Sequence, residues 1–149
     1  MPTPLTDSKN LPVLLYRLGQ AMPGMVARNI KAAGLERKLK PGMGPILRVL
    51  EKADGRRITE LAAELGLSHV AVIGMVRKME AAGLVKPKDC VDDGRATRIW
   101  LTAAGRKMLP KLPEIHALNH AALTTALSAA ETKQLTTLLG RVLAALPTK

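Results

Sequence analysis

Residues 56–85, RRITELAAELGLSHVAVIGMVRKMEAAGLV, contain two short helical patterns separated by a turn. The first covers residues 60–65, with Thr59 as its expected N-cap and a glycine as its C-terminal stop. The second opens after Ser68, also an N-cap residue, and runs to about Ala82. Two short helices joined by a glycine-containing turn predict a helix-turn-helix.

The second of these helices has one continuous apolar stripe. Val72, Val76 and Met79 recur at helical spacing, with Met75 beside them, so this face is expected to be buried. The residues that lie largely on other faces are His69, Val70, Ile73 and Arg77. An apolar side chain such as Ile73 is unusual on an exposed face.

Residues 92–102, DDGRATRIWLT, interrupt the helical sequence. Asp93-Gly94 is a turn signal, and Thr97, Ile99 and Leu101 alternate with Arg98 and Trp100, which is the period of a half-buried strand. Together with a first strand around residues 84–86, this segment predicts a β-hairpin. A hairpin that directly follows a helix-turn-helix defines a winged helix.

The remainder of the chain favours helix. Hydrophobic residues make up 47% of the sequence and aromatic residues only 1%, so Leu, Ala, Val, Ile and Met must build the core. Prolines are expected to bend or interrupt the first helix at Pro23 and a later one at Pro110 and Pro113. The further helices are expected over 11–33, 46–54, 103–126 and 129–146, after a flexible arm at 1–10. The predicted fold class is mainly α, with about six helices and a small β-hairpin wing.

The chain carries 23 Lys and Arg against 12 Asp and Glu, a formal net charge of +11. This excess favours a polyanionic partner, either nucleic acid or an anionic membrane surface. No stretch approaches the ~20 apolar residues of a membrane span, and we expect no signal peptide and no membrane association. A single cysteine, Cys90, excludes an internal disulfide, and we expect a cytoplasmic protein.

The segments ITELAAELGLS, VRKMEAAGLV and DDGRATRIWLTAAG, in this order, resemble the MarR family of bacterial transcription regulators. The resemblance covers essentially the whole chain and implies a single domain over 11–149. Within it, a winged helix-turn-helix lobe would occupy 45–102, with the wing at about 84–102. Helices at 11–34 and 103–149, whose apolar surface is too large for a lone lobe, would form a homodimer.

The resemblance also implies a function. Members of this family regulate transcription, so the chain is expected to bind double-stranded DNA at a near-palindromic site, most simply as a repressor. A small-molecule effector would release the DNA. No nucleophile–base pair, metal cluster or phosphate-binding glycine loop is visible in the sequence, so no enzymatic activity is expected.

The resemblance places the helix after Ser68 in the major groove and the wing beside the adjacent minor groove. Arg95 at the wing tip would lie in the negative potential of that groove, with Asp92 and Asp93 orienting it or Arg98. The alternative is that these charges only close a solvated turn. The residues expected to contact DNA are Arg57, Ser68, His69, Val70, Ala71, Ile73, Arg77, Lys78, Arg95 and Arg98.

The recognition helix departs from the family pattern. Where the family often carries Ser, Thr or Arg, this chain has Val70, Ala71, Ile73 and Gly74, which offer no side-chain hydrogen bonds to base edges but can contact thymine methyl groups. An alternative function is therefore a winged-helix module that binds proteins or coats DNA without sequence preference. DNA contact and solvated surface both stay open for His69, Arg77, Lys78, Arg56 and Arg57.

Three further sets of residues are candidates for binding an effector, binding a metal or reacting through a thiol. An effector cleft could use Tyr16, Arg17, Met43 and Arg48, a hypothesis drawn only from helix order. His116 and His120 have the i, i+4 spacing of metal ligands, but the rest of a ligand set is missing, so no metal and no cofactor are expected. Cys90 has no activating group in the sequence and is expected to be a bystander.

Overall fold

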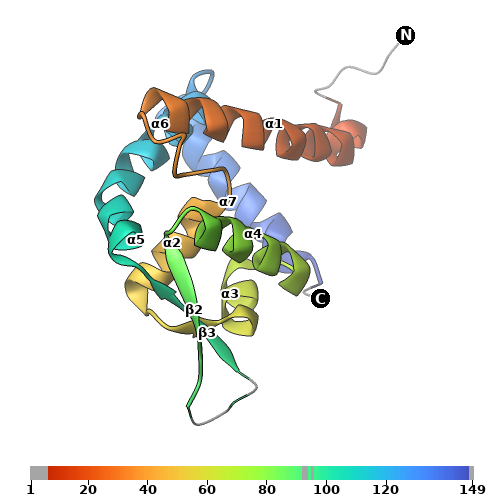
Figure 1. The fold of residues 1–149 in the computed structure, drawn as a ribbon. Helices are drawn as coiled ribbons and strands as arrows, with labels where there is room; N and C mark the ends of the chain where they lie inside the picture. Colours follow the sequence, from red (N-terminus) through yellow and green to blue (C-terminus); the bar gives the residue numbers. More distant parts are fainter. Residues whose placement is uncertain (1–6, 92–93, 95, 148–149) are drawn as a thin grey trace.

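The computed structural model describes residues 7–91, 94 and 96–147 (Figure 1). Asp92, Asp93 and Arg95, three of the predicted wing residues, lie outside the described residues. The described helices are α1 (Leu11–Ala32), α2 (Met43–Lys52), α3 (Ile58–Leu65), α4 (His69–Ala81), α5 (Ala103–Met108), α6 (Leu112–Thr124) and α7 (Ala129–Ala145), with 3-10 turns η1 (Ser8–Asn10) and η2 (Leu109–Lys111). The strands are β1 (Arg56–Arg57), β2 (Val85–Asp89) and β3 (Thr97–Leu101).

The three strands form one antiparallel sheet in the order β1-β3-β2. Strands β2 and β3 are the predicted hairpin, in a register that places Val85 opposite Leu101. Their apolar residues point into the protein: Val85, Ile99 and Leu101 are buried. Strand β1 was not predicted, because two arginines show no alternation and their strand conformation depends on pairing with β3.

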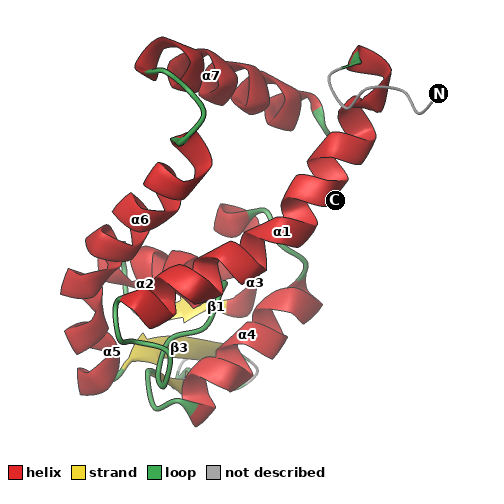
Figure 2. Cartoon of the chain, turned by 90° about the horizontal axis from the view of Figure 1, so that it is seen from above, coloured by secondary structure: helices red, strands yellow, loops and turns green. Residues whose placement is uncertain are grey.

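The core lies where α2, α3 and α4 pack together against this sheet (Figure 2). Met43, Leu47, Leu61 and Met79 are each at most 1% exposed. The predicted buried stripe of α4 is confirmed, since Val72, Val76 and Met79 are buried and Met75 packs against the core. Among the described residues every buried side chain is apolar, so the lobe is held mainly by the hydrophobic effect.

Helices α1, α6 and α7 extend away from this lobe (Figures 1 and 2). The C-terminal part of α1 meets α6, where the Asn29 Nδ2 donates to the Asn119 Oδ1 at 2.8 Å. Helix α7, all of whose residues are described, contains no buried residue. The protomer therefore leaves the apolar side of a 17-residue helix uncovered.

Two boundaries differ from the sequence prediction. Thr59 is not the N-cap of α3: the helix begins at Ile58, and the carboxylate of Glu60 accepts from the backbone N–H of Arg57 at 2.7 Å. Helix α2 begins at Met43 because proline is tolerated in a first turn. The helix expected over 103–126 is interrupted at Pro110, as its prolines predicted, so the described residues there form α5, η2 and α6.

No single helix in the described part of the chain is long and apolar enough to span a membrane. The pair α3 and α4 would be long enough together, but it is bent by 112° at the intervening turn.

Candidate nucleic-acid interface

The turn between α3 and α4 fixes the orientation of the second helix. Gly66 ends α3 with a φ of 64°, a left-handed conformation that glycine adopts without strain. Ser68 then caps α4, accepting from the backbone N–H of Ala71 at 3.1 Å, as the sequence predicts. Two local signals thus produce the 112° bend and leave the start of α4 at the surface.

The outer face of α4 is exposed in the protomer. Val70 is 80% exposed and Ile73 37% exposed, while Arg77 and Lys78 are exposed further along the helix. Within the described ranges neither of these two cations forms an ion pair. The surface is therefore apolar at the start of the helix and cationic near its end.

The wing also carries exposed cations. On β2 only Val85 is buried, and the exposed residues that follow it include Lys86 and Lys88. Strand β2 packs against α4 and pairs with β3 on one side only, and Lys88 lies on the face of the sheet that carries Arg98 and Trp100. A helix with a free face beside a basic β-strand is the geometry that a winged helix offers to a nucleic acid.

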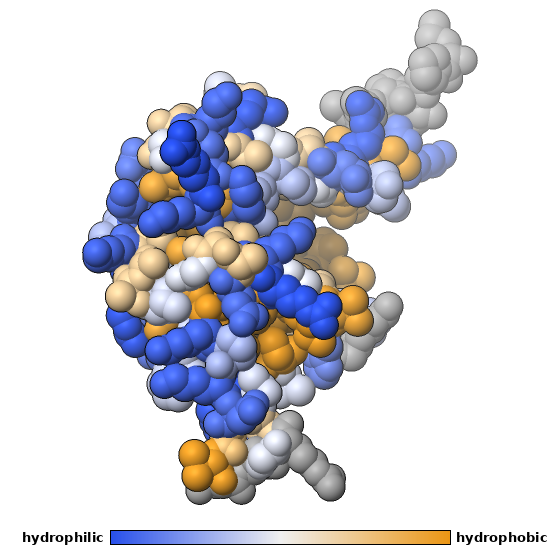
Figure 3. Space-filling model, viewed as in Figure 1, coloured by the Kyte–Doolittle hydropathy of each residue, from blue (hydrophilic) through white to orange (hydrophobic). Residues whose placement is uncertain are grey.

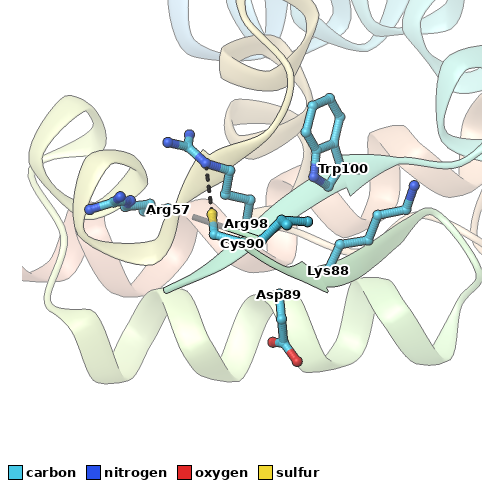
Figure 4. Close-up of a pocket in the computed structure, with 7 residues that line it drawn as sticks. Arg57, Lys88, Asp89, Cys90, Arg98 and Trp100 are labelled. Atoms are coloured by element: carbon cyan, nitrogen blue, oxygen red, sulfur yellow. Dashed lines mark hydrogen bonds between the residues drawn. The ribbon is translucent and has the colours of Figure 1, made fainter. Parts of the chain in front are cut away.

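Arg98 anchors the base of the wing. Its guanidinium Nη1 donates to the carbonyl of Gly55 at 2.7 Å, and its Nε lies 3.1 Å from the Cys90 Sγ (Figure 4). Trp100 packs directly over Gly55, where a Cβ would lie 2.5 Å from the indole ring. In the described residues Arg98 is thus oriented by Gly55 and Cys90, and its predicted contact with DNA stays a prediction.

Asp54, which the sequence did not single out, joins three elements at the other end of β3. Its Oδ1 accepts from the backbone N–H of Leu101 at 3.0 Å, and its Oδ2 accepts from the Arg106 Nη2 at 2.6 Å. The end of α2, the wing strand and α5 are therefore connected through one carboxylate. In the sequence, the Asp54-Gly55 pair indicates only a turn, and nothing in it predicts contacts with Leu101 or Arg106.

The two arginines of β1 have different surroundings. Arg56 pairs with Glu64 of α3 at 2.5 Å, which favours the structural interpretation for that residue. Arg57 lines a cavity of about 410 Å³ under the wing together with Lys88, Cys90, Arg98 and Trp100 (Figure 4). The Arg57 Nε is buried without a hydrogen-bond partner in the described structure. The hydrogen bond from the Arg57 backbone N–H, and then the charges of Arg98, Arg56 and Arg57, lower the pKa of Glu60.

A second cavity, of about 610 Å³, lies between the α1–α2 connection and the end of α4. Its apolar floor includes Met43, Ala81 and Ala82. The cationic side chains that line it are Arg37, Lys38, Lys40 and Lys78, and no acidic side chain lines it. The positive charge of these side chains would attract an anionic ligand.

The predicted DNA-contact residues of α4 are all exposed, but the structure does not assemble the hypothetical effector cleft. Tyr16 is 68% exposed on α1, Arg48 pairs with Glu51 at 3.1 Å on α2, and Met43 is buried. Of Tyr16, Arg17, Met43 and Arg48, only Met43 lines either of the two cavities described above.

His116 and His120 are both exposed on α6. Residues 7–91, 94 and 96–147 contain no group of three or more His, Cys, Asp or Glu side chains placed to hold a metal ion.

Fold and surface together define a winged helix-turn-helix protein. The MarR family model matches residues 41–96. The chain is 33% identical over 104 residues to the HTH-type transcriptional repressor Rv2887 of Mycobacterium tuberculosis. The aligned segment covers 70% of this chain and 72% of the relative. The chain belongs to the MarR family of transcriptional regulators, as its sequence segments predicted.

Solved structures agree with this fold. The transcriptional repressor CouR, bound to a 23-mer DNA duplex, superposes with a TM-score of 0.76 at 22% identity, covering 95% of this chain and 99% of that one. PcaV from Streptomyces coelicolor, in complex with its natural ligand, gives a TM-score of 0.77 at 20% identity, covering 97% of this chain and 98% of that one. The predicted fold class, a mainly helical winged helix-turn-helix, is confirmed.

Proposed function

We propose that this regulator binds a specific double-stranded DNA site as a homodimer, with α4 in the major groove and the wing beside the adjacent minor groove. The observation that carries the proposal is the exposed outer face of α4, against which β2 packs. The exposed cations of these two elements are Arg77, Lys78, Lys86 and Lys88. A major groove admits one α-helix, and neighbouring cations would neutralise the flanking phosphates. CouR, which shares the fold, is bound to DNA.

The homodimer is supported by apolar side chains that the protomer leaves uncovered. They occupy α1 and α7 and the residue after it: Leu11, Val13, Leu14 and Leu18 on the first, and Leu135, Leu138, Val142, Leu143 and Leu146 on the second. All are at least 41% exposed. A second copy of the chain would bury these stripes and hold two α4 helices for the two halves of a near-palindromic site.

Repression and release by an effector are proposed from the relatives. Rv2887 is a repressor, and PcaV has a natural ligand. An anionic effector could bind in the cavity lined by Arg37, Lys38, Lys40 and Lys78, because these cations would pair with its charge. We place the protein in the cytoplasm, where bacterial DNA is found.

The test is selection of genomic fragments by the purified protein at ~150 mM salt, near physiological ionic strength. We expect enrichment of a near-palindromic site. Arg95→Ala should weaken binding to that site by more than about tenfold with little change in Tm, because the wing arginine contributes to groove recognition. Arg141→Ala on α7 removes the same charge far from the wing and should leave the affinity nearly unchanged.

The second candidate function is a winged-helix module that binds proteins or coats DNA without sequence preference. The exposed Val70 and Ile73 favour it, because apolar side chains contribute little to phosphate binding. A coating protein would recover all fragments equally and lose affinity steeply with salt, whereas a regulator should prefer one site by ~10³-fold or more. Equal loss of affinity in Arg95→Ala and Arg141→Ala would also count against site-specific recognition.

A further inference from the structure

The turn before α4 and the first half of α4 present apolar side chains to solvent. Leu67 is 48%, Val70 80% and Ile73 37% exposed. They are separate from the uncovered stripes of α1 and α7, and in the space-filling view orange side chains gather over the end of α4 that follows the turn (Figure 3). A group of exposed apolar side chains on one helix is typical of a surface that contacts a partner with apolar chemistry of its own.

The geometry of α4 places this group where a recognition helix meets DNA. Val70, Ile73, Gly74 and Arg77 have i, i+3, i+4 and i+7 spacing, so they share one face, opposite the buried stripe. Val70 lies in the first turn, which the Ser68 cap holds in place. No heavy atom of the described structure lies within 4 Å of a Cβ built at Gly74, so a surface can approach the helix closely there.

The chemistry of this face excludes hydrogen-bonded base readout at its centre. Neither Val70 nor Ile73 has a polar side-chain atom, and Ala71 and Gly74 add none. Against guanine, adenine or cytosine, such side chains would desolvate donors and acceptors without replacing their hydrogen bonds. Thymine alone among the four bases offers a methyl group in the major groove.

We propose that Val70 and Ile73 read thymine methyl groups in each half-site, an inference that rests on the proposed function. Three residues along a helix rise ~4.5 Å, close to the ~3.4 Å step between base pairs, so the two side chains address neighbouring base pairs. The preferred half-site therefore contains thymines at two adjacent positions, on the same or on opposite strands. Arg77, at the far end of the same face, contacts the backbone or a base beyond them.

The experiment uses deoxyuridine, which removes the methyl group from thymine and keeps the pairing. A site is first selected from a random duplex pool with the full-length protein. Each thymine of the half-site is then replaced singly by deoxyuridine, and the Kd is measured. We expect a loss of roughly fourfold per methyl at two adjacent positions, the value for burying one such group.

Variants assign the methyl contacts to residues. Val70→Ala should abolish the penalty for deoxyuridine at one of the two positions and leave the other. Val91→Ala is the matched control, because Val91 is fully exposed on the wing, and it should preserve both penalties. Unchanged Tm values for both variants would show that they fold.

The outcomes separate the two proposals. A selected site with no deoxyuridine penalty, or with penalties unaffected by Val70→Ala, would overturn the methyl readout and leave site-specific binding intact. If no site is selected, the proposed function fails, and the methyl readout fails with it.

Discussion

At the scale of single residues, Asp54 has partners 47 and 52 residues away along the chain. It is only 16% exposed and accepts from Gly55, Leu101 and Arg106. A carboxylate that satisfies two backbone N–H groups and one guanidinium leaves all three without partners when it is removed.

We therefore expect Asp54→Ala to reduce the free energy of unfolding by about 1–3 kcal/mol. Asp54→Asn keeps an oxygen for the backbone N–H groups and loses only the charge facing Arg106, so its cost should be smaller. Urea denaturation of the two variants measures the difference. Equal effects would mean that the backbone hydrogen bonds contribute nothing.

The pH dependence of stability can be predicted at Glu60. Its pKa is lowered from 4.5 in the folded protein, first by the hydrogen bond from the Arg57 N–H. A carboxyl whose folded pKa is depressed stabilises the protein above the unfolded pKa, and this contribution is lost as the pH falls through the folded value.

Glu60→Gln should accordingly lower the Tm at pH 7, and the difference from the wild type should shrink as the pH falls below 4.5, the ordinary value, and through the lowered pKa of the folded protein. Thermal unfolding across pH 3 to 7, a range of about four units around that pKa, checks this. A difference that stays constant across the range would assign the effect to side-chain packing instead of to charge.

At the scale of elements, the wing and α5 are joined by close backbone contact. The Thr102 Oγ1 donates to the carbonyl of Gly83 at 2.5 Å and accepts from the Gly105 N–H at 3.0 Å. A Cβ at Gly105 would lie 2.1 Å from the Leu84 carbonyl oxygen. Helix α5 therefore packs against the start of β2 only because residue 105 has no side chain.

Gly105→Ala should displace α5 and cost about 1–3 kcal/mol of stability, the usual range for overpacking. Gly74→Ala is the control: it also places alanine inside a helix, but in open space, and should raise stability by up to about 1 kcal/mol through helix propensity. Chemical denaturation compares them. A neutral Gly105→Ala would show that the backbone at α5 adjusts freely.

At the scale of the whole molecule, the uncovered apolar stripes of α1 and α7 support the proposed homodimer. Leu138 is 46% exposed in the protomer, and α7 has no buried residue. A charge at this half-exposed position would keep contact with water in a monomer, but it would be desolvated in a dimer interface.

Leu138→Glu should therefore convert the dimer into monomers and weaken DNA binding, whereas Val91→Glu on the wing should leave the dimer intact. Sedimentation equilibrium at micromolar protein concentration distinguishes the two states. A wild-type chain that is monomeric under these conditions would refute the proposed dimer.

The winged helix can be predicted from the sequence because its signals are local. The Ser68 cap, the stripe of Val72, Val76 and Met79, and the alternation of Thr97, Ile99 and Leu101 each depend on residues close together in the chain, and the structure contains all of them. The exposed apolar face of α4 follows from the same periodicity, since the buried stripe fixes which residues point outward.

The remaining features could not be predicted from the sequence, because they arise from contacts between distant segments. Strand β1 forms because it pairs with β3. Leu101 and Arg106 hold the Asp54 carboxylate in place through hydrogen bonds. The carbonyl of Gly55, 43 residues away, accepts a hydrogen bond from Arg98. The boundary of α3 also moved from Thr59 to Arg57 because the preceding residues belong to the sheet. Periodicity and capping report the conformation of a segment, whereas such partners depend on how the hydrophobic core brings the segments together.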